Sequence, residues 1–197
     1  MGELRQKLTI RLLKDLHELD GFTCGIRLMD DFISRGFSNC VQSHLCTPYA
    51  CYDEKETLVA FFALSFDALD LDSDDKDDLK EGYSQNTSSL PSGYDIFWEK
   101  SRYPALEITY LAVSATMQHK GIGYAVFDAI VDHARRQTVA GCQFITVNAL
   151  HTKEYSAVDF YYKCGFSRYG NLAITSDIIP MFYTLYPDER SMDDDEF

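Results

Sequence analysis

The sequence predicts a single domain of the α/β class, and three observations support that class. Its 197 residues suit one domain, with or without an insertion. Residues 105–113 are rich in apolar and β-forming types, which predicts a largely buried strand. Residues 118–123 follow as a loop with two glycines. Apolar residues then repeat at helical spacing from 122 to 134, so a helix follows the loop.

The other strands and helices follow from the same periodicities. Apolar and β-forming runs predict strands at 8–13, 45–52, 57–66, 144–149 and 177–186. The second and third runs, joined by four residues at 53–56, predict a β-hairpin. Helical spacing predicts helices at 26–37 and 154–164, and a short helix at 74–81. The segment from 67 to about 100 is too long for an ordinary loop, so we interpret it as an insertion near the substrate mouth.

The net charge of -13 is concentrated in two acidic runs. Residues 67–81 hold eight acids and two lysines, and the tail at 188–197 holds six acids and one arginine. Together these runs account for -11, so the remainder of the chain is nearly neutral. Such runs are typical of solvated surface, and they also repel nucleic acid or attract a cationic substrate.

Composition argues against a membrane protein, a secreted protein and a metal protein. No apolar run reaches the ~20 residues of a membrane helix, and residues 1–13 lack the apolar core of a signal peptide. The six cysteines form no Cys-x-x-Cys pair, and the spacing of Cys40, His44, Cys46 and Cys51 fits no usual zinc pattern. We therefore expect a cytoplasmic protein with reduced, structural thiols, no metal and no membrane partner.

The loop after the central strand has the chemistry of a phosphate site. A strand, a glycine loop and a helix start present bare backbone N–H groups and a helix dipole to an anion. A dinucleotide fingerprint would need a glycine where Val126 stands, and a nucleotide P-loop would need Gly-Lys followed by Ser or Thr. The sequence therefore predicts a different pyrophosphate-carrying cofactor. The predicted contacts are Gln118, His119, Lys120, Gly121, Ile122, Gly123 and Tyr124.

Two motifs together resemble one family. Gln-x-x-Gly-x-Gly at 118–123 resembles the acetyl-CoA loop of the GNAT superfamily of N-acetyltransferases, and residues 157–166 match its Ala-x-x-Phe-Tyr-x-x-x-Gly-Phe ending. The resemblance implies one GNAT-type domain over 1–187, whose mixed central sheet of about six to seven strands is flanked by helices and splayed at the acetyl-CoA site. It implies transfer of the acetyl group of acetyl-CoA to a primary amine by direct attack in a ternary complex.

A narrower resemblance points to one branch of that family. Phe22-x-Cys24-Gly25 followed by residues 29–33, and residues 102–104 before the central strand, are similar to the toxin-like branch. That branch implies an aminoacyl-tRNA as the amine and an antitoxin as a partner. A module that binds CoA without catalysis is a further alternative. The sequence does not name the amine, and it leaves a homodimer open.

The same resemblance assigns roles to individual residues. The backbone of Leu111, Ala112 and Val113 lies where the family holds the thioester, although their side chains equally suit core packing. Asn148 is either a hydrogen-bond partner of the cofactor arm or a residue of a strand-terminal turn.

Two further residues are the candidate acid and base. Glu107 is the candidate base, or a strand-end carboxylate that faces water or Arg102. Tyr161 is the candidate acid that protonates the leaving thiolate, or a core aromatic.

Overall fold

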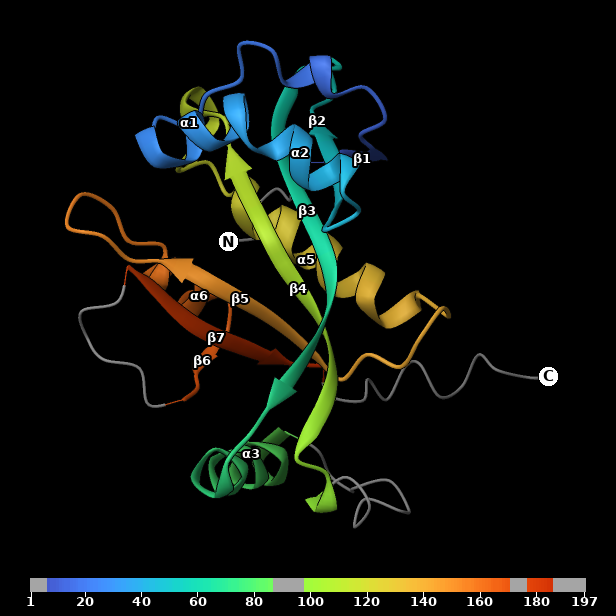
Figure 1. The fold of residues 1–197 in the computed structure, drawn as a ribbon, viewed down its shortest axis with the longest axis vertical. Coiled ribbons are helices and arrows are strands. Elements are labelled where there is room, and N and C mark those ends of the chain that lie inside the picture. Colours follow the sequence, from blue (N-terminus) through green and yellow to red (C-terminus); the bar gives the residue numbers. More distant parts are fainter. Residues whose placement is uncertain (1–6, 87–97, 171–176, 186–197) are drawn as a thin grey trace.

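The computed structural model describes residues 7–86, 98–170 and 177–185, which form one mixed sheet with helices on both faces (Figure 1). Its seven strands lie in the order β1-β2-β3-β4-β5-β7-β6, so the expected mixed sheet is confirmed. Neighbouring strands are antiparallel except β4 and β5, which are parallel. The strands are β1 (Thr9–Leu12), β2 (Thr47–Tyr52), β3 (Leu58–Asp70), β4 (Arg102–Val113), β5 (Phe144–Leu150), β6 (Ser167–Arg168) and β7 (Ile178–Thr184).

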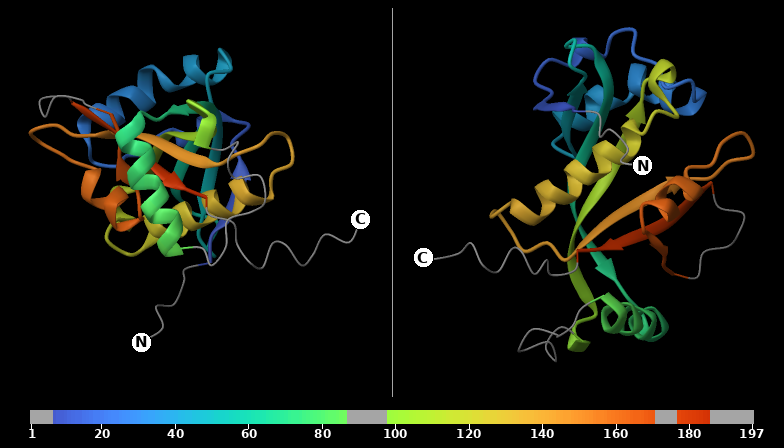
Figure 2. Two further views of the ribbon diagram at one scale, coloured as in Figure 1. Left: turned by 90° about the horizontal axis from the view of Figure 1, so that it is seen from below. Right: turned by 180° about the vertical axis from the view of Figure 1, so that it is seen from behind.

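Helices cover the sheet unequally on its two faces. One face carries α5 and α6, while the other carries α1 and α2 at one end and α3 at the opposite end (Figures 1 and 2). The α-helices are α1 (Arg27–Arg35), α2 (Phe37–Gln42), α3 (Ser73–Asn86), α5 (Ile122–Arg136) and α6 (Val158–Lys163). Two 3-10 turns, η1 (Leu16–Leu19) and η2 (Ala115–Met117), join strands to helices.

Three buried clusters follow from this arrangement. The largest packs α5 and α6 on the sheet, with Ile122, Val126 and Ile130 on the buried side of α5, as their helical spacing predicts. The second lies under α1 and α2 around Phe37, and the third lies under α3 around Tyr103. Between the second and third clusters, the sheet face is not covered by a described helix (Figure 1).

The helix expected at 26–37 is two helices, because the chain turns at Gly36. This glycine ends α1 and begins α2. A Cβ atom at this position would lie 2.8 Å from the ring of Phe32, a distance that real side chains do not adopt. The glycine therefore lets the Phe32 ring pack close to the backbone where the chain changes direction.

The acidic insertion is more regular than the sequence indicates. β3 and β4 continue as a paired ribbon to Asp70 and Arg102, beyond the expected strand bounds. α3 is also longer than the helix expected at 74–81, and its Leu79 is buried with Leu69 and Tyr103 of the ribbon. Residues 87–97 and the acidic tail at 188–197 lie outside the described residues.

The helix expected at 154–164 begins later, at Val158. The preceding residues form a polar turn in which the Thr152 hydroxyl accepts hydrogen bonds from the N–H groups of Glu154 and Tyr155. Such side-chain bonds to the backbone compete with helix formation. The short strand β6, which pairs with β7, carries no pattern that predicts it.

Candidate functional site

The strands β4 and β5 separate partway along the sheet and leave an opening. Their parallel pairing extends only from Ala105 and Phe144 to Glu107 and Thr146. Thr109 forms a β-bulge there, because Ile108 and Tyr110 pair with consecutive residues of β3. Beyond this point the two strands diverge (Figure 1). Alternate backbone N–H and C=O groups of β4 then face the opening rather than a neighbouring strand.

A cavity of about 310 Å³ occupies this opening. It is lined from one face of the sheet by residues of and before α1 and from the other by residues of and before α6, so it connects the two faces. Ile26, Leu28, Met29, Ile108, Thr109, Tyr110, Leu111, Val147, Asn148, Ala149, Leu150, Tyr155, Ala157, Tyr161 and Ile178 form its wall. A mostly apolar wall with a few polar groups is typical of a small-molecule site.

Tyr161 is a buried wall residue with a free hydroxyl group. Its side chain is only 6% exposed, and its ring packs edge-on against Phe160 and Phe166. Its hydroxyl makes no hydrogen bond with any residue that the structure describes. Burial raises the pKa of Tyr161 well above that of an ordinary tyrosine, so the phenol stays protonated at neutral pH. A buried hydroxyl without a partner is unusual, and it indicates a place for a ligand.

Glu107 lies where the opening begins. Its carboxylate accepts a hydrogen bond from the Ser65 hydroxyl at 2.9 Å and one from the Asn148 side-chain amide at 3.1 Å. Arg102 pairs with Asp70 instead, with Nε 3.0 Å from Oδ1, so the alternative of a Glu107–Arg102 pair is wrong. Asn148, expected either to contact the cofactor arm or to belong to a strand-terminal turn, lines the cavity and connects it to Glu107. Side chains of the two neighbouring strands, β3 and β5, thus hold this carboxylate.

The loop before α5 presents unpaired backbone donors. Gly121 caps the helix in the left-handed conformation, with φ of 82°. None of the backbone N–H groups from His119 to Tyr124 donates a hydrogen bond within the described part of the chain. At Gly123, an added Cβ would lie 3.0 Å from the Phe160 ring. The two glycines therefore serve a turn and a close helix packing, and the exposed N–H groups at a helix N-terminus suit a phosphate.

Side chains of the same loop are engaged with the protein. The Gln118 amide donates to the carbonyls of Cys24 at 2.7 Å and Val113 at 3.1 Å, and the Lys120 ammonium donates to the Thr116 carbonyl at 2.7 Å. His119 has a positive φ of 58° and is exposed. The structure thus gives Gln118 a clear structural role, whereas the backbone N–H groups of the loop are free of described partners.

The residues of the central strand divide between packing and the cavity. Leu111 lines the cavity, whereas Ala112 is buried in the cluster under α1 and α2. Val113 packs against the cluster under α5, and its carbonyl accepts the Gln118 bond. Tyr124 is 43% exposed at the start of α5, with its ring beside Phe160.

The Phe-x-Cys-Gly motif has a structural role next to this site. Asp30 of α1 accepts hydrogen bonds from the N–H groups of Cys24 and Gly25 and from the Thr23 hydroxyl. These bonds outweigh the effect of burial and hold the pKa of Asp30 below its usual value. The turn at 23–25 also accepts from the Gln118 amide and from the Ala115 N–H. The motif therefore connects α1 to the loop that follows β4.

Sequence reasoning missed three residues of this site. Ser65 and Asp67 are polar positions two apart in an apolar strand, which signals one solvated face of β3. Their hydrogen bonds to Glu107 and Thr146 depend on strand register, which no local pattern specifies. Tyr155 lines the cavity from a turn, and burial raises its pKa.

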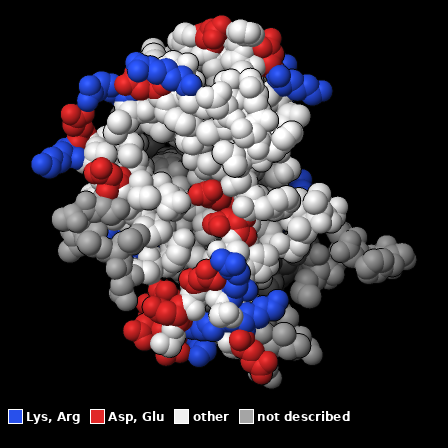
Figure 3. Space-filling view, in the orientation of Figure 1, with Lys and Arg blue, Asp and Glu red and all other residues white. Residues whose placement is uncertain are grey.

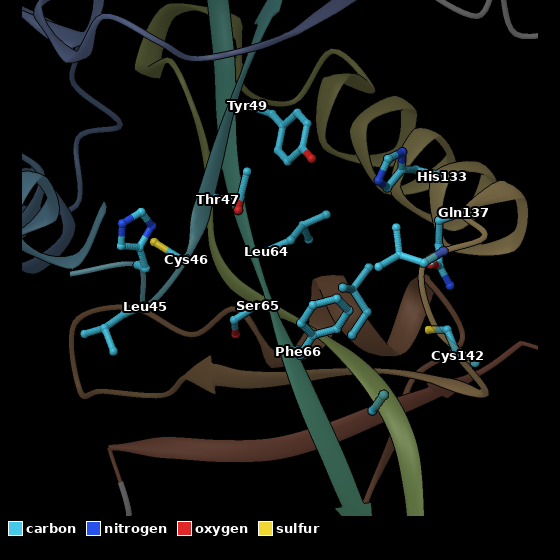
Figure 4. Close-up of a pocket in the computed structure, with 15 residues that line it drawn as sticks. Leu45, Cys46, Thr47, Tyr49, Leu64, Ser65, Phe66, His133, Gln137 and Cys142 are labelled. Atoms are coloured by element: carbon cyan, nitrogen blue, oxygen red, sulfur yellow. The ribbon is translucent and has the colours of Figure 1, made fainter. Parts of the chain in front are cut away.

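A larger cavity of about 540 Å³ lies elsewhere, between β2, β3 and the C-terminal half of α5 (Figure 4). Figure 4 shows Tyr49, Leu64 and His133 on its walls. None of the predicted site residues lines it. Within the described ranges no group of three or more His, Cys, Asp or Glu residues is placed to hold a metal, and no helix could span a membrane.

Comparison with known proteins gives one family and several similar folds. Residues 13–166 match the model of the acetyltransferase (GNAT) family, and no curated protein sequence matches. A crystal structure of a KacT mutant is similar, with a TM-score of 0.63 at 19% identity over 91% of this chain and 96% of that chain. AtaTR bound with acetyl-CoA gives a TM-score of 0.62 at 18% identity, over 90% and 94% of the two chains. AtaT complexed with acetyl-methionyl-tRNAfMet gives 0.61 at 17% identity, over 90% and 95%.

Proposed function

Because the chain belongs to the acetyltransferase (GNAT) family, we propose that it transfers the acetyl group of acetyl-CoA to a primary amine by direct attack within a ternary complex. The observation that carries this proposal is the buried, unpartnered phenol of Tyr161 in the cavity between β4 and β5. A buried hydroxyl without a hydrogen-bond partner among the described residues is costly to the fold, and a proton donor for a leaving group accounts for that cost.

The cofactor half of the proposal rests on the loop before α5. The pyrophosphate accepts hydrogen bonds from the backbone N–H groups between His119 and Tyr124, and the helix dipole favours its charge. The pantetheine arm then runs into the opening beside Leu111 and Val113 of β4. The solved structure of AtaTR bound with acetyl-CoA supports this choice of cofactor.

The transfer itself needs three groups. The amine loses a proton to Glu107 and its nitrogen attacks the thioester carbonyl carbon, so that the carbonyl oxygen becomes an oxyanion. A backbone N–H of the 111–113 stretch stabilises that oxyanion. The intermediate collapses as the carbon–sulfur bond breaks, and Tyr161 gives its proton to the departing thiolate. Tyr161 lines the cavity directly, whereas Glu107 is connected to it through the hydrogen bond from Asn148, a residue of the cavity wall.

An aminoacyl-tRNA acceptor is the second candidate. The likeness to AtaT complexed with acetyl-methionyl-tRNAfMet supports it. The Phe22-x-Cys24-Gly25 motif is weaker support for an aminoacyl-tRNA acceptor than its sequence suggests. Its residues form a turn whose N–H groups bind Asp30, and this structural role explains the motif without a tRNA. A module that binds CoA without catalysis is the remaining alternative.

One experiment separates these candidates. Thiol release from acetyl-CoA is measured against polyamines, amino acids, peptides and aminoacyl-tRNA. We expect thiol release with at least one amine, together with formation of the acetylated form of that amine. Release with aminoacyl-tRNA alone, together with growth arrest on expression, would establish the second candidate. Acetyl-CoA binding by calorimetry without thiol release for any amine would leave only the non-catalytic module.

A further inference from the structure

A polar strip crosses the uncovered sheet face between α1 and α3. Ser65 and Asp67 of β3, Glu107 of β4, and Thr146 and Asn148 of β5 point to this face, because register and two-residue alternation align them. The Thr146 hydroxyl donates a hydrogen bond to the Asp67 carboxylate at 2.5 Å. In the pairing of β4 with β5, Thr146 lies opposite Glu107. Figure 3 shows acidic side chains at the centre of this face, between α1 and α3.

The two carboxylates of the strip carry uncompensated negative charge. Neither Glu107 nor Asp67 forms an ion pair with a Lys, Arg or His in the part of the chain that the structure describes. Asp70, the next acid along β3, differs because it pairs with Arg102. Burial raises the pKa of Tyr169, and the charges of Asp67 and Glu107 raise it further, so both carboxylates act on one phenol at the edge of the strip.

The strip meets the cavity that holds the unpartnered Tyr161 hydroxyl. Asn148 lines that cavity and donates to Glu107, while Asp67 lies diagonally across the sheet from Glu107, at the ~7–8 Å spacing of such neighbours. When an amine attacks beside Glu107, the Asp67 carboxylate therefore lies at a distance that a short alkyl chain on the same amine can span. Asp67 is exposed, so a ligand can reach it.

Resting on the proposed transfer reaction, we propose that Asp67 is the specificity-determining residue that selects acceptors with a second positive charge near the reacting amine. The acceptor class is a primary amine with a second cationic group, as in alkyl diamines, polyamines and lysine-containing peptides. Glu107 receives the reacting nitrogen, and Asp67 binds the second cation by a charge-assisted hydrogen bond. A tRNA backbone would instead be repelled by these two carboxylates.

The test compares Asp67→Asn with the parent protein. Asparagine keeps one oxygen that accepts the Thr146 hydrogen bond, and it loses the charge and the acceptor for the Ala68 N–H group. KM is measured for putrescine, for butylamine, which lacks the second charge, and for aminobutanol, which replaces it by a neutral hydroxyl. We expect KM for putrescine to rise about twofold to fivefold in the variant, the usual worth of an ion pair at an exposed carboxylate, with KM for the other two unchanged. Asp70→Asn is the matched control and should change none of the three values.

Calorimetry of putrescine binding in the presence of CoA gives a readout that does not need turnover. A loss of putrescine affinity in Asp67→Asn but not in Asp70→Asn supports the role of Asp67. If no amine is acetylated in addition, that second result counts against the transfer reaction and not against the role of Asp67. Equal changes for putrescine and butylamine, or equal effects of the two substitutions, would overturn it. Acetylation of aminoacyl-tRNA without binding of putrescine would also overturn it, while the transfer reaction would stand. Spermidine and a lysine peptide, run in parallel, distinguish the two natural sources of such a cation.

Discussion

Replacing Tyr161 by phenylalanine should stabilise the protein and slow its reaction. The substitution removes one hydroxyl from a side chain that is 6% exposed and makes no hydrogen bond to a described residue. An unsatisfied buried polar group costs about 1–3 kcal/mol, so its removal should raise the free energy of unfolding by at least ~1 kcal/mol. For a chain of this length, that corresponds to a Tm increase of about 2–4 °C.

The same substitution removes the proposed proton donor. Thiol release should then fall about 10²-fold in kcat, the usual worth of a positioned acid, while calorimetry gives an unchanged affinity for acetyl-CoA. Tm is measured without ligand. Tyr103→Phe is the matched control, because the buried Tyr103 hydroxyl donates to the Lys100 carbonyl at 3.0 Å. It should lose ~1 kcal/mol of stability and keep its kcat. A Tyr161→Phe protein that is less stable and fully active would refute the reasoning.

Three further predictions concern the base, the loop and the turn. Glu107→Gln should lower kcat about 10²-fold at neutral pH and recover as pH rises, because the free amine becomes abundant; a pH–rate profile that overlays the parent would make Glu107 structural. Gly121→Val with Gly123→Val should abolish acetyl-CoA binding in calorimetry, since the first side chain strains the left-handed turn and the second meets the Phe160 ring, and unchanged affinity would exclude the phosphate assignment. Asp30→Asn should lower stability more at pH 7 than at pH 3. The depressed pKa of Asp30 contributes stability above the unfolded value of 3.8 and loses it as pH falls, so urea unfolding curves that differ equally at both pH values would contradict this.

The parts of the site that sequence could predict are those made by consecutive residues. The glycine loop, the start of α5 and the Tyr161 motif are local, so spacing and resemblance to family motifs identify them. The environment of Glu107 is not local. It combines side chains from β3, β4 and β5, and their meeting depends on register and on the bulge at Thr109.

The fold shows the same division. The order of strands and the main helices follow from apolar periodicity and resemblance, whereas the break at Gly36 depends on where the Phe32 ring packs. The late start of α6 depends on the Thr152 hydroxyl, which competes with the helix for backbone groups. Contacts of this kind are decided by tertiary packing, and a single sequence does not encode them in any short pattern.

The hydrogen bonds of Gln118 have a kinetic consequence. This side chain joins the loop before α5 to the turn at 23–25, and Asp30 joins that turn to α1, whose residues line the cavity from the acceptor side. A pyrophosphate that fixes the loop therefore also fixes the wall against which the amine lies. We expect substrates to add in a compulsory order, with acetyl-CoA first. Initial-rate plots should then intersect, and CoA should be a competitive inhibitor against acetyl-CoA alone.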